Sequence, residues 1–235
     1  KYTVKAIAAQ HGLVASFMPK PIFGINGSGM HCHQSLFDAD GQNLFFDPSD
    51  AFNLSPLAYG FISGQLAHAR ALSAVVAPSV NSYKRLVPGY EAPVYVGWAQ
   101  TNRSALIRIP RFTKGLDKAV RAELRCPDPS CNPYLAFAAM LGAALDGIDR
   151  GLTPPAPLQN VNIYHLTAEE RAELGVRELP ASLREALQEL ERDSVLRDAL
   201  GETVFEAFFR AKWEEWDQYR IHVMDWEVQR YLELA

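Results

Sequence analysis

Residues 121–125 read Arg121-Ala122-Glu123-Leu124-Arg125, so charged and apolar side chains alternate. Successive side chains of a β-strand point to opposite faces. This spacing therefore predicts a strand with Arg121, Glu123 and Arg125 on one face and the two apolar side chains on the other. Two guanidiniums around a carboxylate can clamp anionic groups while the carboxylate binds a hard cation. A structural ladder of salt bridges would show the same spacing, so both interpretations stand.

A second alternation lies upstream, between residues 20 and 35, which read Lys-Pro-Ile-Phe-Gly-Ile-Asn-Gly-Ser-Gly-Met-His-Cys-His-Gln-Ser. Residues 26–29 are small and predict a loop whose backbone N–H groups can approach a ligand closely. His31, His33 and Ser35 follow at strand spacing and share one face. Two imidazoles and a hydroxyl beside a glycine loop suit a metal ion or a phosphate. The alternative is a polar sheet face with satisfied histidines.

Arginines gather around the same region, among segments that read as strands and shaped loops. They are Arg85, Arg103, Arg108, Arg121 and Arg125. Arginines placed among strands lose hydration unless they meet anions, so the cluster predicts a polyanionic ligand such as a nucleotide together with a carboxylate substrate. Alternatively, these side chains extend from sheet edges into solvent. The loop at residues 81–93, which carries Glu91, is shaped by two prolines and a glycine.

Strand-like segments precede helix-like ones along most of the chain. The predicted strands cover residues 14–18, 30–37, 43–46, 94–99, 105–109 and 120–126, and the predicted helices cover residues 3–11, 56–76, a long segment from residue 133, and residues 202–232. This order favours an α+β fold in which an antiparallel β-sheet, a partial barrel, carries the site and packs with several α-helices.

Finer signals refine the helices. Thr167-x-x-Glu170 and Ser182-x-x-Glu185 are capping-box patterns. The segment after Asn132-Pro133 carries apolar residues on every face, which predicts a central helix. The aromatic residues along 202–232 form one stripe, which predicts packing in the core or at an interface.

Composition excludes several classes of protein. The 235 residues are 48% hydrophobic and 21% charged with a formal net charge of −4, which is ordinary for a soluble globular protein and argues against a nucleic-acid-binding surface. No apolar run is long enough to cross a membrane, and no N-terminal signal peptide is visible. The three cysteines, Cys32, Cys126 and Cys131, form no Cys-x-x-Cys pair. We therefore expect a reducing compartment, the cytoplasm, and no disulfide framework.

The ordered motifs resemble one known family. The stretch from Lys20 to Ser35, with its Asn-Gly-Ser-Gly-Met-His-Cys-His-x-Ser core, resembles the ATP-binding signature of class I glutamine synthetases. The runs 81–93 and 102–110 resemble the substrate loops of these enzymes, and 121–129 resembles their strand with a metal-binding glutamate. The likeness extends to Asp225-Trp226-Glu227. It covers essentially residues 1–235 and implies the C-terminal catalytic domain of such an enzyme.

The resemblance implies a role for each matching residue. His31 and Glu123 would bind a Mg²⁺ or Mn²⁺ ion that bridges ATP phosphates. The implied glutamate-binding residues are Asn26, Gly27, Arg85, Glu91 and Arg125. The implied ATP-binding residues are His33, Ser35, Arg103, Lys118 and Arg121. Glu91, Arg103 and Arg108 would be catalytic: the arginines would neutralise the transferred phosphate, and Glu91, on a flap, would take a proton from the ammonium-derived adduct.

The implied reaction is the ATP-dependent ligation of ammonia to glutamate through γ-glutamyl phosphate, giving glutamine, ADP and phosphate. Family members also carry an N-terminal β-grasp domain and further acidic metal ligands upstream, which are absent from these 235 residues. We therefore expect these residues alone to be inactive or nearly so. For the full-length protein the resemblance implies a homo-oligomer, a double hexameric ring, with regulatory proteins as possible partners.

Two other functions share many of these motifs. A related ligase would join glutamate to a larger amine and should diverge around Arg85, Tyr90 and Glu91, which here match the ammonia-using type. A non-catalytic assembly or regulatory domain would be expected to lose a metal ligand or an arginine, and none is lost in this stretch. Tyr164 aligns with a tyrosine that is adenylylated in one subgroup, but its surroundings favour the unmodified kind.

Overall fold

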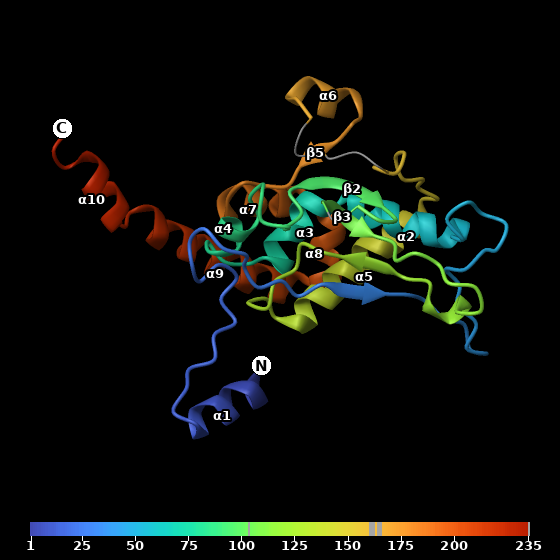
Figure 1. Ribbon diagram of the computed structural model, residues 1–235, viewed down its shortest axis with the longest axis horizontal. Coiled ribbons are helices and arrows are strands. Elements are labelled where there is room, and N and C mark those ends of the chain that lie inside the picture. Colours follow the sequence, from blue (N-terminus) through green and yellow to red (C-terminus); the bar gives the residue numbers. More distant parts are fainter. Residues whose placement is uncertain (103, 160–162, 164–165, 235) are drawn as a thin grey trace.

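The computed structural model describes residues 1–102, 104–159, 163 and 166–234. Its sheet contains five short strands: β1 (Cys32–Gln34), β2 (Tyr95–Ala99), β3 (Ala105–Arg108), β4 (Ala122–Leu124) and β5 (Arg177–Glu178). They lie in the order β1-β4-β3-β2-β5, and the described sheet is open (Figure 1). The predicted α+β class is confirmed.

The pairing within this sheet is mixed. Strands β1, β4 and β3 are antiparallel neighbours, as are β2 and β5. The pair β2–β3 is parallel, with an irregularity between Tyr95 and Trp98. The expectation of a purely antiparallel sheet is therefore corrected at this one pair.

The register of β1, β4 and β3 separates a polar row from an apolar row. His33 lies opposite Glu123, which lies opposite Arg108. One residue along, Cys32 lies opposite Leu124, and Leu124 lies opposite Ile107; all three are buried. The alternation read from the sequence thus places one charged face toward the candidate site and one apolar face toward the core.

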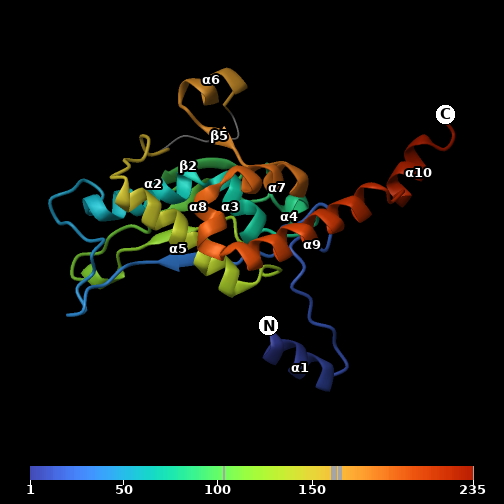
Figure 2. The same cartoon turned by 180° about the vertical axis from the view of Figure 1, so that it is seen from behind.

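Helices cover the apolar face, as the view from behind shows (Figure 2). They are α2 (Pro56–Ala67), α3 (Ala69–Val76), α5 (Pro133–Asp149), α7 (Leu183–Arg192), α8 (Ser194–Leu200) and α9 (Glu202–Arg220). The smaller elements are α1 (Tyr2–Gln10), α4 (Ser82–Arg85), the 3₁₀ helix at Asp117–Ala119, α6 (Ala168–Glu173) and α10 (Asp225–Tyr231). No helix in the described ranges is both long and apolar enough to cross a membrane.

Side-chain caps start several of these helices where the sequence predicts. Ser55 accepts a hydrogen bond from Ala58 N at the start of α2, and Asn132 accepts one from Tyr134 N at the start of α5. The capping box of Thr167 and Glu170 is complete. In the second predicted box, Ser182 caps Glu185 N, but the Glu185 carboxylate accepts from Ala181 N instead.

Helices α2 and α5 approach so closely that glycine is required at Gly64 and Gly147. A Cβ on Gly64 would lie 2.1 Å from the backbone oxygen of Ala143, and one on Gly147 would lie 2.2 Å from the oxygen of Gly60. Real Cβ atoms are never that close to a carbonyl oxygen, so the helix axes would have to separate. The glycines allow α2 and α5 to form the centre of the helical layer.

Three expectations about individual segments are wrong. Residues 14–18 form no strand, because no described segment lies beside them to complete a ladder. Helix α5 is not surrounded by protein: Phe137, Leu141 and Leu145 are 54%, 45% and 42% exposed. The predicted helix over 56–76 is divided at His68, between α2 and α3.

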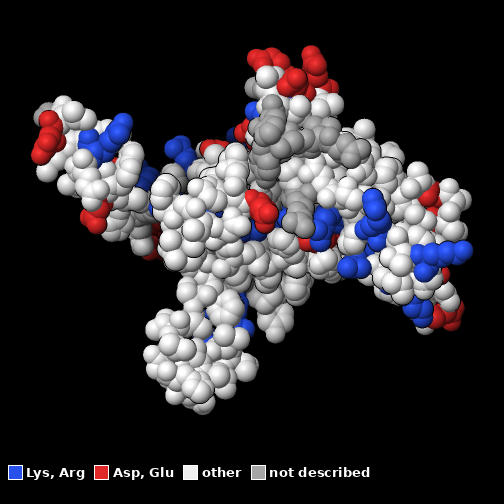
Figure 3. Space-filling model, in the orientation of Figure 1, with Lys and Arg blue, Asp and Glu red and all other residues white. Residues whose placement is uncertain are grey.

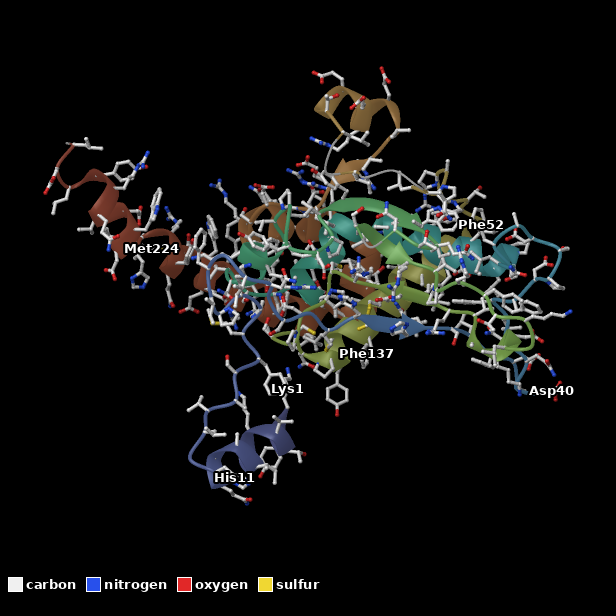
Figure 4. The ribbon with its side chains drawn as sticks, viewed as in Figure 1. Lys1, His11, Asp40, Phe52, Phe137 and Met224 are labelled. Atoms are coloured by element: carbon white, nitrogen blue, oxygen red, sulfur yellow. The ribbon has the colours of Figure 1, made fainter. Side chains whose placement is uncertain are left out.

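The aromatic stripe of the last segment packs only along its first half. Phe205 is buried, and Phe209, Trp213 and Trp216 pack against the core. The helix ends at Arg220, and Trp226 on α10 is 63% exposed. Figure 1 shows α10 and α1 projecting from the body. Figure 4 places His11, which follows α1, away from the body, whereas the Lys1 side chain before α1 donates to Cys131 O at 3.2 Å.

The imidazole of His68 joins three helical segments. Its Nδ1 lies 2.6 Å from Asp193 Oδ2, between α7 and α8, and its Nε2 lies 3.1 Å from Asp146 Oδ2 on α5. The side chain is 11% exposed. The hydrogen bond to Asp193, opposed by burial and helped by Asp146, raises the pKa of His68. Both ring nitrogens can donate only in the protonated form.

The close contact of α2 and α5 predicts a large effect of one methyl group. We expect Gly64→Ala in the natural protein to lower the free energy of unfolding by about 3 kcal/mol or more, because the clash involves backbone rather than a mobile side chain. Thermal unfolding measures the loss. Ser63→Ala, one residue away, removes only a hydroxyl that donates to Tyr59 O and should cost about 1 kcal/mol. Equal losses would contradict this account of the contact.

The His68 bridge predicts a pH-dependent stability. Because the folded pKa is raised above the ordinary 6.5, the bridge stabilises fully below pH 6.5 and its contribution is lost as pH rises through the folded pKa. We expect His68→Gln to lower the midpoint of thermal unfolding more at pH 6 than at pH 9. The other charged groups that line the hollow beside the ring are Arg70, Arg150, Arg177, Glu189 and Arg192, and none is a histidine. An equal decrease of the unfolding midpoint at pH 6 and at pH 9 would contradict a stabilising role of the protonated His68.

Candidate active site

The glycine-rich loop before β1 is held in place by backbone and amide hydrogen bonds. Ser28 N donates to Pro19 O at 2.8 Å, and Met30 N donates to Pro127 O at 2.8 Å. The Asn81 amide accepts from Lys20 N at 2.7 Å and donates to Lys20 O at 3.0 Å. The loop is therefore fixed at both ends and at α4.

Two glycines of this loop make room for Arg85. A Cβ on Gly29 would lie 2.5 Å from Arg85 Nη2. A Cβ on Gly27 would lie 2.1 Å from Pro19 O and 3.3 Å from Arg85 Cγ. Small residues are needed here because the loop crosses directly over the guanidinium.

Arg85 is itself 4% exposed and is held by carbonyl groups. Its Nη1 donates to Cys126 O at 2.8 Å, and its Nη2 donates to Arg125 O at 3.1 Å. Burial lowers the pKa of Arg85, and the charge of Asp128 opposes that shift. A guanidinium this strongly basic remains charged, so it is fixed as a positive group at the base of a pocket.

That pocket, of about 430 Å³, brings together most of the residues predicted to bind a carboxylate substrate. It is lined by Asn26, Gly27, Gly29, His31, Arg85, Tyr90, Glu91, Ala92 and Arg125. All five predicted glutamate-binding residues are among them. They come from the glycine loop, α4, the loop after it and the end of β4, so the fold assembles a pocket from segments far apart in the chain.

A buried carboxylate, that of Glu123, lies at the edge of this pocket and meets three cationic or ionisable side chains. Its Oε2 accepts from Arg108 Nε at 2.6 Å, and its Oε1 lies 2.9 Å from His31 Nδ1 and 3.7 Å from Arg125 Nε. Glu123 is 1% exposed. Burial and the charge of Arg125 lower the pKa of His31, while Glu123 opposes that shift. A neutral imidazole is the form that binds metal ions.

His31 and Glu123 offer a nitrogen and an oxygen donor side by side, which fits part of a metal site. Among the described residues, no group of three or more His, Cys, Asp or Glu side chains is arranged to hold a metal ion. Both carboxylate oxygens of Glu123 also contact arginines, Oε2 with Arg108 and Oε1 with Arg125. The described residues therefore supply two candidate ligands and not a complete coordination shell.

The predicted ATP-binding residues do not all line one pocket. Arg121 Nε lies 3.0 Å from His33 Nδ1, on the same sheet face as Glu123. His33 and Ser35 line an adjoining hollow of about 630 Å³, which shares His31 with the pocket around Arg85 and also includes Phe137 and Leu141 of α5. Lys118 is exposed on the 3₁₀ helix. Arg103 lies outside the described residues, as does Tyr164. Figure 3 shows Lys and Arg side chains gathered over this face of the molecule.

Glu91 lies in the left-handed region with φ of 55°, which non-glycine residues rarely adopt. It is exposed at the mouth of the pocket, and its carbonyl oxygen lies 3.5 Å from Arg125 Nη2. The loop of residues 87–93 thus holds an acidic side chain over the pocket at some cost in backbone strain.

Sequence reasoning missed three residues that shape the site. Asp128 is fully buried, and its charge acts on Arg85; the sequence pattern assigned it no role. Asn81 holds the glycine loop, and Lys20 Nζ lies 3.7 Å from the centre of the Tyr90 ring. Only the presence of Lys20 and Asn81 in the two motif-rich runs hinted at these contacts.

The three cysteines are all buried and free, as the sequence predicts. Burial raises the pKa of Cys32 to about 11 and that of Cys126 and Cys131 to about 12. Thiols that remain protonated at neutral pH are poor nucleophiles and poor ligands. The described site therefore uses no thiolate chemistry.

The chain is similar to known proteins over almost all of its length. The family model described as "Glutamine synthetase, catalytic domain" matches residues 1–231. Glutamine synthetases of Thermotoga maritima and Thermus thermophilus are 56% and 57% identical to the chain, over 100% and 99% of it and 52% and 51% of their own length. A solved structure titled "GmaS/ADP complex-Conformation 1" superimposes with a TM-score of 0.88 at 39% identity, covering 99% of this chain and 52% of that one. The chain spans about half the length of the curated relatives it matches.

The network around Glu123 predicts the effect of removing one charge. We expect Glu123→Gln in the natural protein to lower the free energy of unfolding by about 3–5 kcal/mol, because Arg108 and Arg125 lose the buried carboxylate that offsets their charge. Chemical denaturation measures this. Glu178→Gln removes a pair with Arg171 that is 55% exposed on the glutamate side and should cost at most about 1 kcal/mol. Similar losses for both variants would show that Glu123 does not hold the arginines together.

Proposed function

Since the chain belongs to the glutamine synthetase family, whose catalytic-domain model matches residues 1–231, we propose that the natural protein joins ammonia to the γ-carboxylate of L-glutamate at the expense of ATP. The observation that carries this proposal is the pocket in which Arg85, Arg125 and the glycine loop meet beside His31 and Glu123. A buried guanidinium at the base and a second one on the wall suit a small carboxylate.

The reaction would proceed in two balanced steps. A γ-carboxylate oxygen of glutamate attacks the γ-phosphorus of ATP, and the bond to the ADP oxygen breaks to give γ-glutamyl phosphate. The nitrogen of ammonia then attacks the acyl carbon, phosphate leaves with the electrons of the C–O bond, and the surplus proton goes to a base. Both steps develop negative charge on phosphate oxygens, so positioned cations supply most of the stabilisation.

Each role in the pocket follows from position and charge. Arg85 and Arg125, with Asn26 and Gly27, would hold glutamate. Arg108, one-third exposed beside Glu123, would neutralise the transferred phosphate together with Arg103. Glu91, at the mouth of the pocket, would accept the proton and shield the acyl phosphate from water.

Nucleotide and metal would bind on the neighbouring sheet face. His33, Ser35, Lys118 and Arg121 would contact ATP. His31 and Glu123 would hold Mg²⁺ or Mn²⁺, with the remaining ligands supplied by carboxylates outside these 235 residues. The bound ion would neutralise phosphate charge and orient the phosphates.

The unmatched half of the relatives' length suggests what completes the site. We propose that the natural chain carries an N-terminal β-grasp domain and upstream acidic ligands. Strand β1 ends the described sheet with a free edge, and Phe137 and Leu141 of α5 are exposed in a hollow that β1 also lines. Unpaired strand edges and apolar stripes are normally covered. Residues 1–235 alone would then be inactive, and the natural protein would be a cytoplasmic homo-oligomer, a double hexameric ring.

Activity measurements test which amine the natural protein uses. ADP formation by the natural protein with glutamate, ATP and Mg²⁺ is compared in ammonium, in methylamine and in larger amines. We expect ADP formation to require ammonium. A requirement for a larger amine would move the protein to a related ligase, and no ADP formation with any amine would favour a non-catalytic role.

Substitution ties the activity to the proposed residues. We expect His31→Ala and Glu123→Ala to reduce kcat/KM at least a hundredfold and to raise the Mg²⁺ concentration required. Arg85→Lys should mainly raise KM for glutamate, because a lysine cannot reproduce the fork that faces the pocket. His11→Ala, at the exposed residue that follows α1, is the matched control and should leave kcat/KM unchanged. Full activity of Glu123→Ala would contradict the proposed site.

A further inference from the structure

A second charged pocket, of about 310 Å³, lies among helices that the candidate active site does not use. It is lined by Ala67, His68, Arg70, Ala71, Arg150, Arg177, Glu189, Arg192, Asp193, Ser194 and Val195. These residues come from the α2–α3 junction, the end of α5, β5 and the α7–α8 junction. None of them lines the pocket around Arg85.

The guanidiniums of this pocket are positioned by the fold. Arg70 donates through Nε to Glu189 Oε1 at 3.0 Å and through Nη1 to the Glu178 carbonyl. Arg177 Nη2 donates to Leu66 O at 3.3 Å, and Arg150 Nη1 donates to Asp146 Oδ2 at 2.8 Å. Each uses only part of its five N–H donors in these contacts. The remaining donors are available on groups whose orientation is already set.

The charge of the pocket is positive although the chain as a whole is acidic, with a formal net charge of −4. Four arginines face the carboxylates of Glu189 and Asp193, with Asp146 behind His68. His68, held between two carboxylates, adds a further positive charge when protonated. In the part of the chain that the structure describes, Arg192 has no carboxylate within salt-bridge distance. An excess of guanidinium charge around a hollow attracts a small anion.

We propose that this pocket binds a small oxyanion with two or more negative charges, a phosphate group or a di- or tricarboxylate, and that binding ties α3, α5, α7 and β5 together. Guanidiniums bind both kinds of oxyanion through paired N–H donors, which is the chemistry that the two ligand types share. The small side chains of Ala67 and Ala71 leave the space open. The pocket volume of about 310 Å³ suits a ligand of that size.

Two arginines of this pocket, Arg177 and Arg192, do not line the pocket around Arg85. Arg177 and Arg192 are exposed and make no ion pair with another described residue, so replacing them disturbs the fold little. Arg184→Ala, on α7 but outside the pocket, is the matched control. The double variant Arg177→Ala/Arg192→Ala should retain the ADP-forming activity of the natural protein.

The first measurement is the midpoint of thermal unfolding of the natural protein with increasing inorganic phosphate, citrate or chloride at constant ionic strength. A ligand that binds only the folded protein raises the midpoint. Any phosphate bound at the active site contributes equally in all variants. We expect phosphate, citrate or both to raise the unfolding midpoint of Arg184→Ala. The double variant should need at least tenfold more of the same anion for an equal rise in its midpoint. Identical curves for the two would overturn the proposal.

The second measurement locates the ligand. Phenylglyoxal modifies accessible guanidiniums, and mass spectrometry of the peptides reports each arginine separately. The effective anion should protect Arg177 and Arg192 at least threefold and leave Arg184 unprotected. Protection by citrate alone would identify a polycarboxylate, and protection by phosphate alone would identify a phosphate group. Equal modification with and without both anions would overturn the proposal.

Discussion

The fold of the candidate site depends on one buried carboxylate. Glu123 is 1% exposed, in the middle of three strands, and it contacts Arg108, Arg125 and His31. A carboxylate so placed is stable only with cations around it, and the arginines are tolerated at the sheet only because the carboxylate is there. This mutual dependence brings a positive pocket wall and a candidate metal ligand to the same point. It also explains why the apolar row of Cys32, Leu124 and Ile107 must face the other way.

Much of this arrangement could be predicted from period-two patterns. The alternations at residues 31–35 and 121–125 correctly placed His33 and Arg121 on the face that carries Glu123. Local patterns, however, carry no information about which strands become neighbours. The parallel pair β2–β3 and the free edge of β1 follow from long-range pairing, and the extended segment at 14–18 lacks a partner among the described residues.

Burial was harder to predict than secondary structure. Helix α5 has apolar side chains on every face, and this pattern predicts a helix in the centre of the protein. In the structure, one side of α5 packs against Gly60 and Gly64 of α2, while Phe137 and Leu141 are exposed. A pattern cannot distinguish a helix covered by its own domain from one that a further segment would cover. Asp128 was missed for a similar reason, because a short polar residue before proline indicates a chain reversal whether or not its charge is used.

Two pockets with similar chemistry serve different parts of the fold. The pocket at Arg85 lies beside the sheet and is lined in part by the glycine loop. The pocket at His68 lies mainly between helices, and the glycine loop does not line it. In the first, Arg85 is oriented by carbonyl oxygens, and in the second, Arg70, Arg150 and Arg177 are oriented by carbonyl or carboxylate oxygens before any ligand arrives. Such preorganisation lowers the entropy cost of binding an anion.

The central claim is that His31, and not His33, shares a metal ion with Glu123. Electron–nuclear double resonance of Mn²⁺ bound to the natural protein, labelled with ¹⁵N-histidine, measures this directly. The account predicts an imidazole ¹⁵N coupling that is lost in His31→Ala and retained in His33→Ala. A coupling that persists in His31→Ala, or disappears in His33→Ala, would contradict it.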